Sequence, residues 1–254
     1  GNGTLITSEL CLATKAALAN ANKNKFTWIG FDCCLMAVAD LATMLSDYYD
    51  YMIASQETEY GEGWDHDVWM KAIIENTQVT PEVLVEKITS SFLTYYHTTE
   101  QCGHAHFTDG STYICLSTLS AFDLSKVDPF ITAFNSLVNS IGTNQTAFSK
   151  FKNSFTASTT YNKFGEGDYG LADFVSFLNT LSTKQNRNVQ AVKDAISDLV
   201  ISNHYCNYYS SYHCVPCGLN IFFPESTGEY ILQVDKSQYQ TKLSAWKTMI
   251  MSGW

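Results

Sequence analysis

The sequence lacks the long apolar run of a membrane span and the basic surface of a nucleic-acid-binding protein. No segment approaches the roughly 20 apolar residues that cross a bilayer. Lysine and arginine total 15 against 25 acidic residues, the formal charge is -10, and no stretch concentrates the basic residues. We therefore expect neither a transmembrane segment nor a nucleic-acid partner.

The sequence also has no internal repeat, no low-complexity segment and no charged-then-apolar secretion signal. Because the chain opens with Gly1-Asn2-Gly3-Thr4, we expect a mature or processed product. Hydrophobic residues make up 45% of the 254 residues and charged residues 16%, which leaves enough apolar surface to offset the entropy of ordering the chain. A folded chain with one large domain, or a domain plus a subdomain, is expected.

The order of apolar segments at the start of the chain predicts an α/β fold. Residues 7–19 have the pattern of a helix, and the nearly continuous apolar run 26–31 that of a strand covered on both faces. Residues 35–48 predict a second helix and 51–54 a second strand. This strand–helix–strand spacing is typical of a right-handed βαβ unit with parallel strands.

The whole chain divides into three predicted segments. We expect a catalytic region in residues 1–143, a helical subdomain in 144–199, and a return strand with a closing helix in 200–254. The elements expected after the βαβ unit are a helix over 80–96, a strand over 111–117, a helix over 126–141, a strand over 218–224 and a helix over 239–251.

Asp32, Cys33 and Cys34 directly follow the first predicted strand, where an open α/β sheet collects its reactive groups. In the first turn of the expected helix, a thiol would feel the partial positive charge of unpaired N–H groups, which favours the thiolate. Two cysteines after a buried strand can also pack as small apolar side chains. Position alone leaves both roles open.

Four motifs in order resemble those of the clostripain-like cysteine peptidases, and the similarity spans nearly the whole chain. They are Phe31-Asp32-Cys33-Cys34-Leu35-Met36, Ala54-Ser55-Gln56-Glu57-Thr58, Gly61-Glu62-Gly63-Trp64 and Gly218-Leu219-Asn220-Ile221-Phe222-Phe223-Pro224. The resemblance implies a caspase-like α/β/α sandwich with a mostly parallel central sheet and a C-terminal helical subdomain. It also implies a Cys–His dyad that hydrolyses peptide bonds after Arg or Lys.

Matched to the family motifs, Cys34 falls on the nucleophile and Cys33 on the usually small residue before it. Asp32 falls on an acidic residue of the pocket for the basic side chain, and Glu62 on a second acidic position. A buried carboxylate pairs with a guanidinium or ammonium and rejects neutral side chains. Asp32 also has an alternative role as the N-cap of the helix after it.

The family's catalytic histidine lies upstream of the cysteine, but no histidine precedes Cys34. Of the downstream histidines, His104 and His106 could reach the thiol only from a loop; the others are His66, His97, His204 and His213. We therefore expect this chain to be the heavy chain of a self-cleaved precursor, with the histidine on an associated light chain. By the same resemblance we expect secretion, a periplasmic or cell-surface location and no required cofactor, with a calcium requirement left open.

A second group of candidate ligands lies near the end of the chain. His204, Cys206, His213, Cys214 and Cys217 cluster there, and Cys214 and Cys217 have the spacing of a zinc knuckle or a redox pair. Zinc binding, a disulfide and unpaired packed thiols all remain open. The alternative function is therefore a noncatalytic caspase-like interaction or zinc-binding module that has lost its histidine.

Overall fold

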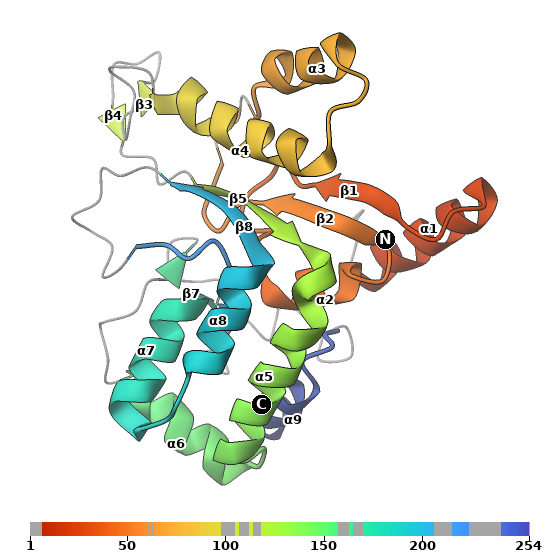
Figure 1. The fold of residues 1–254 in the computed structure, drawn as a ribbon. Coiled ribbons are helices and arrows are strands. Elements are labelled where there is room, and N and C mark those ends of the chain that lie inside the picture. The colour runs from red at the N-terminus through yellow and green to blue at the C-terminus, as the bar shows by residue number, and fades with distance from the viewer. Residues whose placement is uncertain are drawn as a thin grey trace, which may run out of the picture.

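The computed structural model describes residues 7–59, 61, 63–97, 105–106, 112–113, 118–156, 163–164, 170–205, 215–223 and 240–253. Within these ranges a four-stranded sheet lies between two groups of helices, α3 and α4 on one face and the larger group on the other (Figure 1). This arrangement confirms the expected α/β sandwich. None of the described helices is long and apolar enough to cross a membrane.

The central sheet has the strand order β1-β2-β5-β8. Strand β1 (Phe26–Gly30) pairs in parallel with β2 (Tyr49–Ala54), as the βαβ pattern predicts. Strand β5 (Thr118–Asp123) pairs antiparallel with both β2 and β8 (Val200–Tyr205). The described part of the sheet is therefore mixed, and the expectation of a mostly parallel sheet holds only for β1 and β2.

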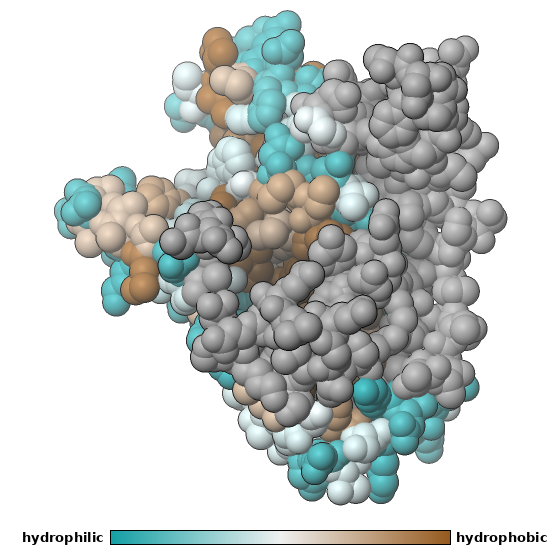
Figure 2. Space-filling model, turned by 180° about the vertical axis from the view of Figure 1, so that it is seen from behind, coloured by the Kyte–Doolittle hydropathy of each residue, from teal (hydrophilic) through white to brown (hydrophobic). Residues whose placement is uncertain are grey.

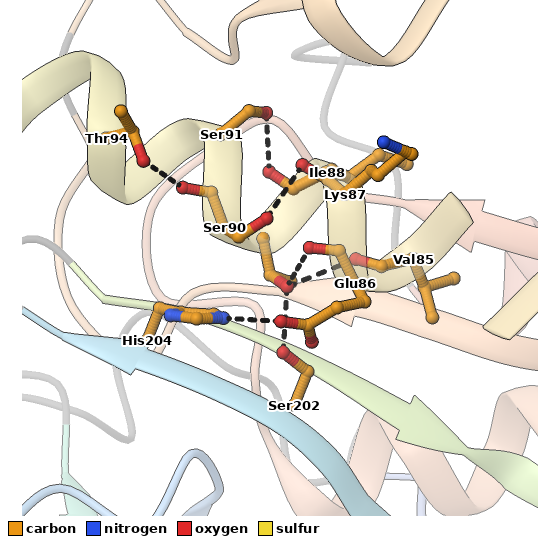
Figure 3. Close-up of polar contacts among 10 residues, drawn as sticks. Val85, Glu86, Lys87, Ile88, Ser90, Ser91, Thr94, Ser202 and His204 are labelled. Carbon is orange, nitrogen blue, oxygen red and sulfur yellow. Dashed lines mark hydrogen bonds and ion pairs between the residues drawn. The ribbon is translucent and has the colours of Figure 1, made fainter. Parts of the chain in front are cut away.

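One face of the sheet is covered by α4 (Pro81–His97), which lies beside α3 (His66–Glu75). The cluster between α4 and the sheet is apolar and consists of Ile53, Trp64, Leu84, Val85, Ile88, Phe92, Leu119 and Ala121. Polar contacts also join α4 to β8. His204 Nε2 lies 3.2 Å from Glu86 Oε1, as Figure 3 shows, and Thr89 Oγ1 lies 2.8 Å from Ser202 Oγ.

The main core lies against the other face. The elements that build it are α2 (Ala39–Leu45), the short helix η1 (Leu124–Lys126), α5 (Val127–Ile141), α7 (Phe174–Gln185), α8 (Gln190–Leu199) and α9 (Ser244–Gly253). Aromatic rings pack at its centre, where Trp246 contacts Phe134, Phe177 and Phe223. The closing helix is thereby fixed to the body of the protein.

The remaining elements are short or peripheral. They are α1 (Thr7–Ala21), α6 (Gln145–Thr156), β3 (Ala105–His106), β4 (Thr112–Tyr113), β6 (Lys163–Phe164), β7 (Leu171–Asp173) and β9 (Asn220–Phe222). Strand β7 pairs with both β6 and β9. The helices predicted over 7–19, 80–96 and 126–141 are confirmed. The closing helix predicted over 239–251 begins only at Ser244, and the strand predicted over 218–224 is the shorter β9. Of the strand predicted over 111–117, only 112–113 lie within the described residues, as β4, and the three-segment division at residues 143 and 199 stays a prediction.

Candidate active site

The segment after β1 is a loop and not the helix that the sequence predicts. Helix α2 begins only at Ala39, and its N-cap is Val38. The loop runs beside the extension of β2, because the N–H groups of Leu35 and Ala37 donate to the carbonyls of Glu57 and Ser55 at 3.1 and 2.8 Å. Leu35 has a φ of 66°, a left-handed conformation that interrupts helical geometry.

The loop structure overturns two expectations. Cys34 is not in the first turn of a helix, so a helix dipole does not act on its thiol, and Asp32 does not cap α2. The exposed Cys34 side chain is positioned instead by the chain after β2: the N–H of Glu59 donates to Cys34 Sγ at 3.2 Å. Cys33 is also exposed, but burial of its thiol group raises its pKa. Cys33 therefore remains a protonated, weakly nucleophilic thiol at neutral pH.

The carboxylate of Asp32 is held by residues that follow β2. Its Oδ2 accepts a hydrogen bond from the N–H of Trp64 at 3.2 Å and lies 3.2 Å from His66 Nε2. Gly63 has a φ of 72°, and a Cβ on it would lie 2.7 Å from Asp32 Oδ2. Glycine at this position is therefore required both by the backbone conformation and by the close approach of the carboxylate.

Trp64 connects the acidic group to the sheet. A Cβ on Gly30, the last residue of β1, would lie 2.6 Å from the Trp64 ring, so the indole packs directly on the strand backbone. The indole Nε1 donates to Glu59 Oε2 at 3.2 Å, while the backbone N–H donates to Asp32. One tryptophan thus fixes two carboxyl groups beside Cys34.

Glu59 is the most perturbed carboxyl group of the site. Burial, the negative charge of Asp32 and a hydrogen bond with the Asp32 side chain raise the pKa of Glu59 to about 9, against the lowering effect of the Trp64 hydrogen bond. A group with this pKa is neutral at pH 7 and carries a proton that it can donate. Glu59 therefore adds no negative charge to the site at neutral pH.

A buried polar network supports the loop that carries Glu59. Gln56 Nε2 donates to Asp173 Oδ2 at 3.1 Å and to Asn220 Oδ1 at 3.0 Å, and Gln56 Oε1 accepts from the N–H of Gly218 at 2.6 Å. Asp173 Oδ2 also accepts from the N–H of Cys217 at 2.7 Å. Because these side chains are buried and their polar atoms are paired, the network joins the Ser-Gln-Glu motif to β7 and β9.

The structure brings only part of the predicted site together. Asp32 and Cys34 share one loop, and Glu62 lies outside the described residues. His66 contacts Asp32, and His204 contacts the exposed Glu86 of α4. The other candidate histidines are His97, His104, His106 and His213, whose side chains lie outside the described part.

The predicted ligand group near the end of the chain is described only at His204 and Cys217. Cys206, His213 and Cys214 lie outside the described residues. Cys217 is a free thiol that donates to the carbonyl of Leu219, and burial raises its pKa well above the ordinary value. Within the described ranges no three His, Cys, Asp or Glu side chains gather in a metal-binding group. The described residues thus favour the packed-thiol interpretation for Cys217.

Sequence reasoning missed Glu59, Trp64 and His66 as site residues. Their contacts with Cys34 and Asp32 span 25 to 34 positions of the chain. The local signal for these residues is the motif from Gly61 to Trp64, from which the family resemblance indicates only Glu62 as a site residue.

Several solved structures that are similar to this one are cysteine proteases, although each of the three described below shares less than a quarter of its residues with this chain. A cysteine protease from B. fragilis has a TM-score of 0.71 and 18% identity, covering 100% of this chain and 97% of its own. A clostripain from Bacteroides thetaiotaomicron, in complex with the peptide inhibitor BTN-VLTK-AOMK, has a TM-score of 0.64 and 15% identity, covering 95% and 94%. The secreted C11 cysteine protease iotapain, from the same species, has a TM-score of 0.63 and 17% identity, covering 93% and 59%.

No curated protein sequence is significantly similar to this chain. The sequence model of the clostripain family, by contrast, matches residues 2–252. The match covers every described element of the fold except the last residue of α9, and it includes the loop with Asp32 and Cys34 and the motif that ends at Trp64. The chain belongs to the clostripain family and is a cysteine peptidase.

Proposed function

We propose that this peptidase cleaves peptide bonds after arginine or lysine, with Cys34 as the nucleophile and Asp32 as the carboxylate that binds the basic side chain. One observation carries the proposal: an exposed thiol and a carboxylate, two residues apart, lie on one loop at the end of β1. An anchored carboxylate prefers a cationic side chain, since a neutral one would leave its charge unpaired. A relative with this fold binds an inhibitor whose peptide part is VLTK.

The proposed reaction is acyl transfer through a thioester. A histidine takes the thiol proton, Cys34 Sγ attacks the carbonyl carbon, and the amine leaves with that proton as the thioester forms. Water then attacks the thioester, gives a proton back to the sulfur and releases the acid. Glu62 is proposed as a second acidic position of the pocket, and no cofactor is required because the thiol and imidazole supply the chemistry.

We place the catalytic histidine on a light chain that adds to the open edge of the sheet. Among the described strands, β1 pairs only with β2, so its other edge has unpaired backbone groups that favour strand addition. The view from behind shows hydrophobic surface between α1 and α3 (Figure 2). The exposed Leu12 of α1 and Ile74 of α3 have 68% and 75% of their surface accessible. Such a surface is suited to burial by a further part of the enzyme.

Two further proposals follow from the cleavage specificity and the family. A peptidase that cuts after basic residues can cut its own precursor between the histidine and cysteine strands, which yields light and heavy chains that stay together. We propose an extracellular or periplasmic location for the enzyme, since iotapain, which shares the fold, is secreted.

Kinetics with matched peptides tests the specificity. We expect efficient cleavage after arginine or lysine and little after citrulline, which has the shape of arginine without its charge. Asp32→Asn should lower kcat/KM for the basic peptides about 100-fold or more, whereas Asp65→Asn, at the N-cap of α3, should leave it unchanged. Equal cleavage after arginine and citrulline, or full activity of the Asp32 variant, would contradict the proposal.

A further inference from the structure

We propose that Glu59 is a further specificity residue: its carboxyl shares one proton with Asp32 while the pocket is empty and releases that proton to solvent when a cationic substrate side chain enters. This inference rests on the proposed specificity for basic residues. It assigns the pocket a second negative charge that exists only in the substrate complex.

The geometry around Glu59 carries the argument. Its Oε2 accepts a hydrogen bond from the indole N–H of Trp64 at 3.2 Å, whereas no donor reaches its buried Oε1, so the bond with Asp32 requires a proton on one of the two carboxyls. If both carboxyls were ionised, Glu59 and Asp32 would repel each other in a partly buried site. A proton on Glu59 converts this contact into a hydrogen bond, so the empty pocket favours one shared proton.

The titratable groups near the Asp32 and Glu59 carboxyls come from the loop after β1 and from α3. Asp32, Cys33 and Cys34 lie on the loop after β1, and His66 begins α3. His66 Nε2 lies 3.2 Å from Asp32 Oδ2, so His66 is a second group beside Asp32 for which the experiment needs a control. Burial is the main cause of the raised pKa of Glu59, and the charge of Asp32 is the next. A cationic substrate group placed beside both carboxyls offsets the Asp32 charge and attracts an ionised Glu59, so its entry favours loss of the proton.

The same residue also connects the pocket to the nucleophile. Glu59 donates its backbone N–H to Cys34 Sγ at 3.2 Å, so its carboxyl and its main chain act at two places in one site. Substitution of the side chain leaves this N–H in place. Glu59→Gln therefore separates the proposed proton release from the positioning of the thiol.

Calorimetric titration of the complete enzyme measures the proposed proton directly. The Cys34→Ala heavy chain, co-expressed with a separately encoded light chain because this variant cannot cut its own precursor, binds an arginine peptide without turnover. Binding heats at pH 8 in two buffers of different ionisation enthalpy then give the protons released. We expect release of about one proton for the arginine peptide and none for the citrulline peptide. Adding Glu59→Gln should abolish the release and weaken arginine binding roughly 10- to 100-fold.

Two controls make the outcome specific. Glu75→Gln, at the far end of α3, should change neither the proton count nor the affinity. His66→Gln should retain the proton release if Glu59 is its source. Arginine binding without proton release, or unchanged release in the Glu59 variant, would overturn the inference while leaving the specificity intact. Failure to distinguish arginine from citrulline would instead refute the proposed specificity, and the inference with it.

Discussion

Replacement of Asp173 by alanine should destabilise the protein strongly, because this buried carboxylate is the acceptor for three donors. Its Oδ1 accepts from the N–H of Ser176 at 2.8 Å, and its Oδ2 accepts from Cys217 at 2.7 Å and Gln56 at 3.1 Å. The substitution removes the N-cap of α7 and the bond that holds the segment before β9.

The size of the effect follows from the two main-chain donors. Each buried donor that loses its acceptor costs about 1–3 kcal/mol, so the variant should lose about 4 kcal/mol. For a chain of this length that corresponds to a fall in Tm of roughly 8–16 °C. Activity should fall as well, since Gln56 lies three residues before Glu59, which positions Cys34.

Thermal melting followed by circular dichroism measures this loss, with Asp123→Ala as the matched control. Asp123 also caps a helix, but it accepts one exposed hydrogen bond, from the N–H of Ser125 at 3.0 Å. Its replacement should cost about 1 kcal/mol. If the two variants melted within a degree or two of each other, the buried network would not have the stabilising role that we assign to it.

Three further predictions concern the site and its requirements. Because the folded protein holds a proton on Glu59 up to about pH 9 and the unfolded chain releases it near about pH 4.3, the contribution of Glu59 to stability is present at acid pH and falls as pH rises between these values. A series of Tm measurements should therefore decline less over this interval for Glu59→Gln than for the wild type, and parallel curves would contradict the raised pKa. Gly63→Ala should reduce kcat/KM for arginine peptides at least about tenfold, because its Cβ would displace Asp32 and its φ is left-handed. Gly61→Ala meets nothing within 4 Å and should retain activity, so equal effects of the two changes would refute this reasoning. Treatment with EDTA should leave peptide cleavage unchanged, and a loss that calcium restores would show a metal requirement.

The sequence was sufficient to predict the fold class and the place of Asp32 and Cys34 directly after β1, because both depend on local signals. The apolar run before Asp32 and the next apolar strand correctly predicted the parallel pair β1 and β2. Strand β8 follows α8 without a break, at Val200, and short polar-containing strands of this kind have weak local patterns. The antiparallel pairing of β5 with β2 and β8 depends on contacts between distant segments of the chain.

The local structure around Cys34 could not be predicted, because tertiary contacts override the helical pattern there. Residues 35–38 contain good helix formers, yet the N–H of Leu35 bonds to Glu57 and the carbonyl of Ala37 accepts from Asn220, 183 positions away in the chain. The same holds for the carboxyl pair, since only the folded loop brings Glu59 to Asp32. The family motif located the site, but not the contacts within it.

Covalent labelling tests the central assignment most directly. A peptidyl ketone with lysine or arginine beside its reactive group should inactivate the enzyme, and mass spectrometry of the digested protein should place one adduct on Cys34. Cys33→Ala should be labelled at the same position, and Cys34→Ala should be neither labelled nor active. An adduct on another cysteine, or turnover that survives in Cys34→Ala, would show that the thiol after β1 is not the nucleophile.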